Sequence, residues 1–392
     1  MKNIWLCLAA LPVIWSCNFK KIDVPTAVRF EKTLDFGDYR YYYPKDIIAT
    51  PDKGSVIVGF SDSNDQHQAF LVRLTESGDV LWGVQNFGGP KTEARAVTAT
   101  ADAGFLVCGW TLPQNQGPDQ QIWVAKFDAS GNFTQHVFGS PNRTETAFGI
   151  VPVSNGNYCI GFSAVTAGIA SIRLLFVDGT SGDSLNDVPV NTAKAFPPAD
   201  MIATADGYIA LTGADFATGK TMVLKINETG QVLTPSPNCP ANSFGQALAE
   251  LPDNSLVVAG YAAANNGDFF LTAYSSTGLA RWTTPPQFSV GNNDDELWSV
   301  CATRDSQLLV LGYTLSYSGS PELYWSKRSA ADGNRIWPDD WHYKPANRLS
   351  VIGGAVSPCA DNGFILCATM ENSPGTLLLL KTDAEGDYHK PI

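Results

Sequence analysis

Short apolar segments recur along this chain about every fifty residues. GFLVCGW, residues 104–110, is one of them, and it follows the turn-forming residues TADA. Asp, Asn and Gly at such places supply turn dihedrals that other residues resist. Each segment is therefore predicted to be the second strand of a hairpin. The small residue that the segments share is Gly59, Gly109, Gly161, Gly213, Gly260, Gly312 and Ala368, with spacings of 50, 52, 52, 47, 52 and 56.

A further apolar strand follows each of these segments, as WVAKF does at residues 123–127. That strand meets a turn containing glycine, and one more strand comes after the turn. With the strand before the hairpin, such as AVTAT at 96–100, each unit has four strands. Helical periodicity is absent from these units. Seven units of about 50 residues predict an all-β fold, a seven-bladed β-propeller of four-stranded antiparallel blades.

The two ends of the chain predict how the ring closes. The seventh unit stops soon after its third strand, in LLLLKTDAEGDYHKPI. A spare strand, FEKTLDFGD at residues 30–38, stands near the N-terminus, and its Phe36-Gly37 matches Phe87-Gly88 and Phe138-Gly139. We expect this N-terminal strand to complete the last blade, which leaves no open edge between the first and last blades.

The first seventeen residues have the form of an export signal. Lys2 precedes an apolar run, Ile4 to Trp15, that is too short to span a bilayer. The run ends at Ser16-Cys17, which resembles the lipobox of bacterial lipoproteins. That resemblance implies that Cys17 becomes the first mature residue and carries acyl groups such as palmitate. An ordinary cleaved signal is the alternative.

This interpretation divides the chain into three parts. Residues 1–16 are predicted to be a lipoprotein signal peptide, 17–27 a lipidated tether and 28–392 the propeller. The protein is then expected on the bacterial cell envelope, lipid-anchored at the outer membrane, with its propeller in the periplasm or on the surface.

Composition and charge exclude some classes of function. The 392 residues are 44 % hydrophobic and 16 % charged, which is enough apolar material for a large core. The net charge of −12 repels a nucleic-acid backbone, so we expect no nucleic-acid partner. We expect the propeller to be a monomer. Six cysteines lie beyond Cys17 and none forms a C-x-x-C pair, which argues against zinc and thioredoxin-type sites. Mostly free, buried thiols are expected.

The repeats resemble those of bacterial propellers built from DGG-apolar-G-aromatic and D-x-x-G-x-x-x-W motifs, and more distantly those of quinoprotein (PQQ-like) dehydrogenases. Trp82, Trp282 and Trp337 each stand four residues after a glycine. The resemblance implies that these tryptophans dock neighbouring blades. A bound quinone needs a metal and a base in the channel, and no motif supplies them, so no cofactor and no metal site are expected.

Candidate chemistry is confined to one end of the predicted channel. The four histidines, His67, His136, His342 and His389, have no metalloprotease spacing and are expected to be solvated loop or strand-surface residues. Aligning the repeats places nine residues at or near the mouth where the innermost strands begin. They are Asp46, Glu93, Arg95, Glu145, Asp200, Gln246, Asp295, Glu296 and Trp298.

Such a ring suits a cation, a sugar or a basic peptide; the simpler interpretation is that the mouth is polar because water fills it. We expect a non-catalytic envelope lipoprotein that binds a protein partner or a glycan through its loop-rich face. The alternative is a glycan hydrolase or lyase that draws an acid–base pair from Glu93, Glu145, Asp200 and Glu296. A quinoprotein-like oxidoreductase is the more remote alternative.

Overall fold

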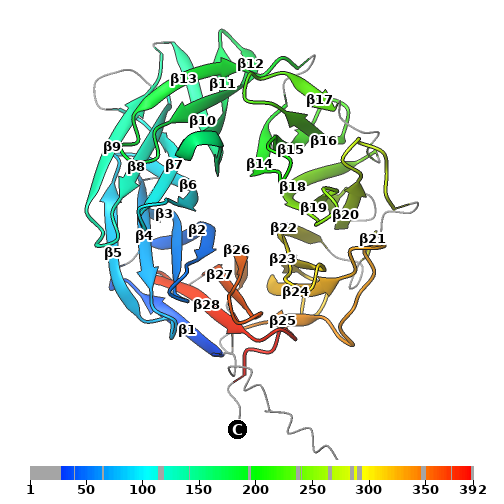
Figure 1. The fold of residues 1–392 in the computed structure, drawn as a ribbon. Helices are drawn as coiled ribbons and strands as arrows, with labels where there is room; N and C mark the ends of the chain where they lie inside the picture. The colour runs from blue at the N-terminus through cyan, green and yellow to red at the C-terminus, as the bar shows by residue number, and fades with distance from the viewer. Residues whose placement is uncertain are drawn as a thin grey trace, which may run out of the picture.

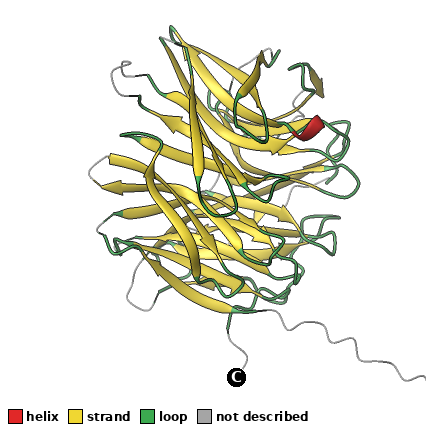
Figure 2. Ribbon diagram, turned by 60° about the vertical axis from the view of Figure 1, so that its left-hand side comes forward, coloured by secondary structure: helices red, strands yellow, loops and turns green. Residues whose placement is uncertain are grey.

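The strands form seven four-stranded antiparallel sheets arranged in a ring (Figure 1). The computed structural model describes residues 28–38, 40–63, 66–113, 119–140, 142–192, 196–234, 239, 241–263, 267–282, 287–288, 294–345, 350–371 and 373–389. Within these residues a single short helical turn, Ser154–Gly156, interrupts the strands and loops (Figure 2). The predicted all-β, seven-bladed propeller is confirmed.

Each blade runs from an inner strand at the centre of the ring to an outer strand at its rim. The inner strands are β2 (Tyr41–Ala49), β6 (Thr92–Ala99), β10 (Arg143–Pro152), β14 (Pro198–Ala203), β18 (Ser243–Glu250), β22 (Asp295–Ala302) and β26 (Val351–Pro358). The second strands are β3 (Ser55–Ser63), β7 (Phe105–Thr111), β11 (Tyr158–Thr166), β15 (Ile209–Asp215), β19 (Leu256–Ala262), β23 (Leu308–Thr314) and β27 (Phe364–Met370).

The outer half of each blade consists of a third strand and an outer strand. The third strands are β4 (Gln66–Leu74), β8 (Gln121–Phe127), β12 (Ile169–Val177), β16 (Lys220–Ile226), β20 (Asp268–Tyr274), β24 (Glu322–Arg328) and β28 (Thr376–Thr382). The outer strands are β5 (Val80–Phe87), β9 (Phe133–Phe138), β13 (Ser184–Pro189), β17 (Val232–Thr234), β21 (Gln287–Phe288), β25 (Trp341–Tyr343) and β1 (Phe30–Asp35).

The ring closes through the N-terminal strand, as predicted. β1 pairs antiparallel with β28, from Phe30 opposite Lys381 to Asp35 opposite Thr376, and so becomes the outer strand of the seventh blade. Phe30 and Leu34 point inward and are 3 % and 7 % exposed. Their cluster contains residues of the seventh and first blades, so the last blade is held to the first by apolar packing.

Close approach of the inner strand within the same blade explains the recurring glycine of the second strands. At Gly109 an added Cβ would lie 1.8 Å from the carbonyl oxygen of Glu93 on the adjacent inner strand. Gly312 meets the carbonyl oxygen of Glu296 in the same way, at 1.9 Å. The inner strand therefore approaches so closely that only glycine fits at these positions.

The three tryptophans of the D-x-x-G-x-x-x-W motif dock neighbouring blades. The Trp82 indole donates a hydrogen bond to the Ala129 carbonyl of the second blade at 3.2 Å. Trp282 does the same with the Ala330 carbonyl of the sixth blade at 3.4 Å. Trp337 lies over a turn of the seventh blade. The docking role implied by the sequence resemblance is present in all three.

A repeated ion pair lies on the face of the ring at which the inner strands end. In five blades a buried Lys or Arg of the third strand pairs with an Asp in the turn between the first two strands. The pairs are Arg73–Asp52 at 2.5 Å, Lys126–Asp102 at 2.8 Å, Lys225–Asp206 at 2.5 Å, Lys327–Asp305 at 2.8 Å and Lys381–Asp361 at 2.8 Å. These ion pairs fix the turns and place no chemistry in the channel.

Candidate functional site

All seven inner strands share a β-bulge in the part where they begin, at which the register to the second strand shifts. A bulge leaves one residue out of the ladder and re-aims its side chain. The residues left out are Lys45, Arg95, Phe148, Ala199, Gln246, Trp298 and Gly353. We call the end of the central channel that they surround the channel mouth.

Two cationic and two aromatic side chains share one cavity in the channel mouth. The cavity has a volume of about 360 Å³, and residues of five blades line it, among them Lys45, Arg95, Phe148, Phe216 and Gln246. Enclosure by the ring and repulsion from Arg95 lower the pKa of the Lys45 ammonium to about 8. This part of the mouth is therefore positively charged on a protein whose net charge is −12.

Glu93 is the centre of a buried polar cluster beside that cavity. Its carboxylate pairs with the Arg95 guanidinium at 2.6 Å and accepts a hydrogen bond from the Trp110 indole at 3.2 Å. It also contacts Nδ1 of His67. Glu93 is 4 % exposed. The predicted residues Glu93 and Arg95 thus lie together, and Glu93 positions the guanidinium as its counter-ion.

His67 is a strand residue, within the expectation of a solvated loop or strand-surface position, but it is only partly exposed and contacts Glu93. Its ring stacks on Phe60 with centroids 4.7 Å apart, and its side chain is 19 % exposed. The β3–β4 hairpin of the first blade carries it across to Glu93 at the start of the second blade. A cavity of about 650 Å³ lies at this cluster and shares Arg95 and Thr146 with the first cavity.

The opposite part of the channel mouth is acidic and aromatic. Gln246 donates a hydrogen bond to Glu296 at 3.3 Å, and Trp298 stacks on Tyr313 with ring centroids 4.7 Å apart. Burial raises the pKa of Glu296, and the nearby charge of Asp294 raises it further. The fifth and sixth blades therefore bring the predicted residues Gln246, Glu296 and Trp298 together.

Asp46 and Asp200 join neighbouring blades. Asp46 accepts backbone hydrogen bonds from Ile47 at 2.8 Å and from Val97 of the next blade at 2.9 Å. Asp200 accepts them from Met201 at 2.7 Å and from Leu248 of the next blade at 2.8 Å. Each carboxylate thereby satisfies an amide on the open edge of an inner strand.

Burial dominates the titration of these two carboxyl groups. The pKa of Asp46 is raised to about 6, although hydrogen bonds from the Val97 and Ile47 amides oppose the shift. The pKa of Asp200 is raised to about 7 against the corresponding amides, with a small further contribution from the Asp46 charge. Both carboxyl groups therefore hold protons at a higher pH than an exposed aspartate does.

Glu145 and Asp295 line neither cavity of the channel mouth. Glu145 is fully buried and contacts Arg143, and burial raises its pKa although the Arg143 charge opposes this. Asp295 is 1 % exposed and accepts a hydrogen bond from the Ser316 hydroxyl at 3.3 Å. Both residues lie near the start of an inner strand; Glu145 stands between Thr144 and Thr146, which line the cavities.

Sequence reasoning missed Lys45 and Phe148, both of which are bulge residues. The repeat alignment placed Arg95, Gln246 and Trp298 at the mouth but did not reveal that a bulge re-aims one residue in every inner strand. Aligning the seven inner strands on the residue that faces the recurrent glycine would have found Lys45. In the first blade that residue is Pro44, which faces Gly59, and Lys45 follows it directly.

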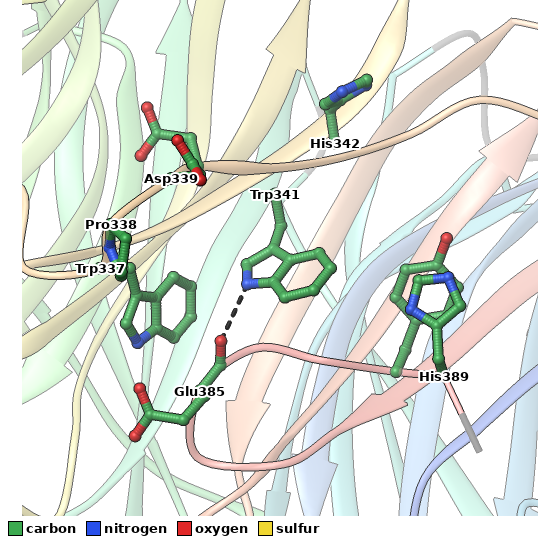
Figure 3. A pocket seen from close by; sticks show the side chains of 9 residues that line it. Trp337, Pro338, Asp339, Trp341, His342, Glu385 and His389 are labelled. Atoms are coloured by element: carbon green, nitrogen blue, oxygen red, sulfur yellow. Dashed lines mark hydrogen bonds between the residues drawn. The ribbon is translucent and has the colours of Figure 1, made fainter. Parts of the chain in front are cut away.

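A third pocket lies at the rim of the ring, where the sixth and seventh blades meet (Figure 3). Its volume is about 560 Å³, and we call it the rim pocket. It is lined by Trp337, Pro338, Asp339, Asp340, Trp341, His342, Glu385, Tyr388 and His389. The Trp341 indole donates a hydrogen bond to the Glu385 carbonyl at 2.8 Å.

No group of three His, Cys, Asp or Glu side chains within the described ranges is placed to hold a metal ion. The six cysteines of the propeller are all free thiols, and five of them are buried. Among the residues that the structure describes, no helix is long and apolar enough to cross a bilayer. Cys17 lies outside those residues.

No protein-family model and no curated protein match this chain. Solved structures do match in fold. Polysaccharide lyase Uly1 aligns over 91 % of this chain and 100 % of its own, with a TM-score of 0.56 and 9 % identity. Sqt1 of Chaetomium thermophilum, bound to the N-terminus of ribosomal protein L10, aligns over 89 % and 98 %, with a TM-score of 0.51 and 10 % identity.

A protein of unknown function from Dyadobacter fermentans aligns over 77 % of this chain and 98 % of its own, with a TM-score of 0.53 and 12 % identity. At such identities these likenesses show the propeller fold alone, because one propeller scaffold supports many unrelated functions. The more specific likeness to quinoprotein repeats stays a prediction.

Proposed function

We propose that this protein is a non-catalytic binding protein of the bacterial cell envelope, and that its channel mouth holds an acidic group of a glycan or a partner protein. The observation that carries the proposal is the cavity shared by Lys45 and Arg95, with Phe148 and Phe216 in its walls. Apolar walls with a few convergent polar groups are typical of ligand sites.

The charges of this cavity favour an anionic ligand. Glu93 partly balances Arg95, whereas no carboxylate of the described residues lies within salt-bridge distance of Lys45. A carboxylate or sulfate group of the ligand would supply that missing counter-charge and accept charge-assisted hydrogen bonds. Sqt1 and Uly1 show that the shared fold is compatible with holding a protein segment or a polysaccharide.

The test is isothermal titration calorimetry of the full chain with an oligogalacturonate, a tetraglutamate peptide and the uncharged sugar maltotriose. We expect an acidic probe to bind, and Lys45→Met to weaken that binding about tenfold or more, because a hydrogen bond to a charged group contributes ~1.5–3 kcal/mol. Lys45→Arg should retain most of the affinity.

Lys53→Met is the matched control, because Lys53 is a surface lysine, 55 % exposed, in the turn after the same inner strand. Binding of maltotriose as tight as that of the acidic probes would contradict the proposal. So would an affinity that is equal in Lys45→Met and Lys53→Met.

A glycan lyase is the second candidate, and one observation favours it. An amine whose pKa is about 8 is partly unprotonated at neutral to mildly basic pH, so Lys45 is suited to accept a proton. In that reaction Lys45 would take the C5 proton of a uronic acid whose carboxylate Arg95 neutralises. The C5–H electron pair would form the C4=C5 double bond as the C4–O bond breaks, and the Lys45 ammonium would return the proton to the departing glycosidic oxygen. Incubating the full chain with the oligogalacturonate and recording ultraviolet absorbance decides between the two candidates. Elimination produces an unsaturated sugar that absorbs ultraviolet light, whereas binding alone does not.

The envelope address is part of the same proposal. Its support is the N-terminal pattern of a short apolar run that ends at Cys17. Acyl groups on that cysteine, followed by a tether of residues 17–27, would hold the propeller near a membrane surface.

A further inference from the structure

Several aromatic side chains gather at the junction that contains the rim pocket. At the two other junctions described above, a single tryptophan makes the docking hydrogen bond. Here the turn 383–387 of the seventh blade is surrounded by Trp325, Trp337 and Trp341. The Trp325 indole donates to the Gly386 carbonyl at 3.1 Å, and an added Cβ on Gly386 would lie 2.5 Å from the Trp337 ring.

Trp341 and Tyr388 pack against the apolar cluster of this junction and also line the pocket beside it. Trp341 and Tyr388 meet edge to face, with ring centroids 6.4 Å apart, and Tyr388 stacks on His389 at 4.3 Å. Figure 3 shows Trp337, Trp341 and His389 around the pocket, with Asp339 and Glu385 on opposite sides of it. Its volume of about 560 Å³ leaves room for a side chain and the start of the chain that carries it.

Most carboxylates around this junction already have a cationic partner. Arg29 pairs with Asp383 at 2.9 Å and with Asp387 at 2.7 Å. Asp340 lies 3.4 Å from Arg328 and accepts a hydrogen bond from Ser326 at 2.5 Å. These three carboxylates are therefore committed to holding the seventh blade and its neighbour.

Two carboxylates in the pocket have no such partner. Asp339 and Glu385 make no ion pair with any lysine, arginine or histidine of the described residues. The neighbouring histidines are engaged elsewhere, His342 with Glu322 at 2.7 Å and His389 with Asp387 at 2.9 Å. Within the described residues, the pocket therefore combines two carboxylates that have no cationic partner with the partly exposed rings of Trp341 and Tyr388 and the exposed ring of His389.

We propose that the rim pocket binds the cationic side chain of an arginine or lysine from a partner protein. An aromatic ring face attracts such a cation through its quadrupole, and the two carboxylates attract it through their charge. The channel mouth and the rim pocket then have opposite preferences, the mouth for an acidic group and the rim for a basic one. This site does not depend on the function proposed for the mouth.

Calorimetry of the full chain with a triarginine peptide tests the proposal, with tetramethylammonium and maltotriose as further probes. We expect triarginine to bind at low ionic strength and its affinity to fall with added salt. The double variant Asp339→Asn/Glu385→Gln keeps the size of both side chains and should weaken binding by about tenfold, because each exposed ion pair contributes only modestly.

The matched control is Glu76→Gln/Asp183→Asn, which removes two exposed carboxylates in the first and third blades. It should bind triarginine as the unmodified chain does, and so should Lys45→Met in the channel mouth. Tetramethylammonium binding that depends on Asp339 and Glu385 would support the same chemistry without a peptide.

Three results would overturn the proposal. The first is no saturable binding of triarginine or tetramethylammonium. The second is an equal affinity in the double variant and its control. The third is maltotriose binding that is insensitive to salt and to both substitutions while the cations do not bind, because that result identifies a sugar site.

Discussion

Closure of the ring through β1 predicts that Leu34→Ala destabilises the whole protein. Leu34 is 7 % exposed, faces Leu377 across the β1–β28 ladder and belongs to the cluster that joins the seventh and first blades. Truncating a buried leucine costs about 2–5 kcal/mol, through lost burial and the cavity that is left. Since the position lies near the edge of its cluster, we expect about 2–3 kcal/mol.

The matched control is Leu81→Ala, the same chemical change on the outer strand of the first blade. Leu81 is 57 % exposed, so its truncation should cost less than about 1 kcal/mol. Urea unfolding followed by far-ultraviolet circular dichroism measures both variants. Amide hydrogen exchange adds a local readout, because opening at the closure should speed exchange in β2 and β26–β28 before the fourth blade.

Equal unfolding midpoints for Leu34→Ala and Leu81→Ala would refute this reasoning. Leu34 would then contribute no more to the ring than an exposed leucine does. Exchange that accelerates uniformly in all blades would separately refute the idea that β1 closes one particular junction.

Three further predictions concern single residues. Burial raises the pKa of Asp200 from 3.8 to about 7, so the stability contributed by its protonated form is fully present below pH 3.8 and is lost progressively as the pH rises to about 7. Asp200→Asn should remove that pH dependence of unfolding, worth at most about 4 kcal/mol, and an unchanged profile would contradict it. Burial raises the pKa of Asp102, but hydrogen bonds from Lys126 and Thr100 outweigh it and lower the value to about 2. Asp102→Asn should therefore cost about 1 kcal/mol at pH 7, a value reduced because Asp102 is half exposed, and almost nothing at pH 2; equal losses at both pH values would disprove this. Cys17→Ala should abolish acyl labelling and release the protein from membranes, and unchanged fractionation would rule out the lipid anchor.

The sequence was sufficient to predict the fold because the same local contacts recur in every blade. Gly109 and Gly312 are required by the same close approach of an inner-strand carbonyl. Trp82 and Trp282 make the same hydrogen bond to the next blade. Signals that depend on neighbours along the chain, or on one repeated neighbour, are visible in a single sequence.

The chemistry of the mouth was less predictable because it depends on contacts between blades. Glu93 reads as an acid in the sequence, but in the structure it is the buried counter-ion of Arg95 and a partner of His67 from another blade. The sequence likewise suggests that Asp46 and Asp200 are acidic residues of the channel mouth. In the structure they accept amide hydrogen bonds from the next inner strand. Residue type alone does not distinguish these roles.

The seven bulges offer a physical criterion for where function lies on this ring. Each bulge re-aims one side chain in similar backbone surroundings, so packing within the blade imposes little choice of residue there. The side chains nevertheless differ from blade to blade, from Lys45 and Arg95 on one side to Gln246 and Trp298 on the other. Positions that packing dictates are alike in many blades, as the glycines of the second strands are. Under the function proposed above, a charge that appears in only one or two blades at an otherwise equivalent position is expected to contact the ligand of the channel mouth.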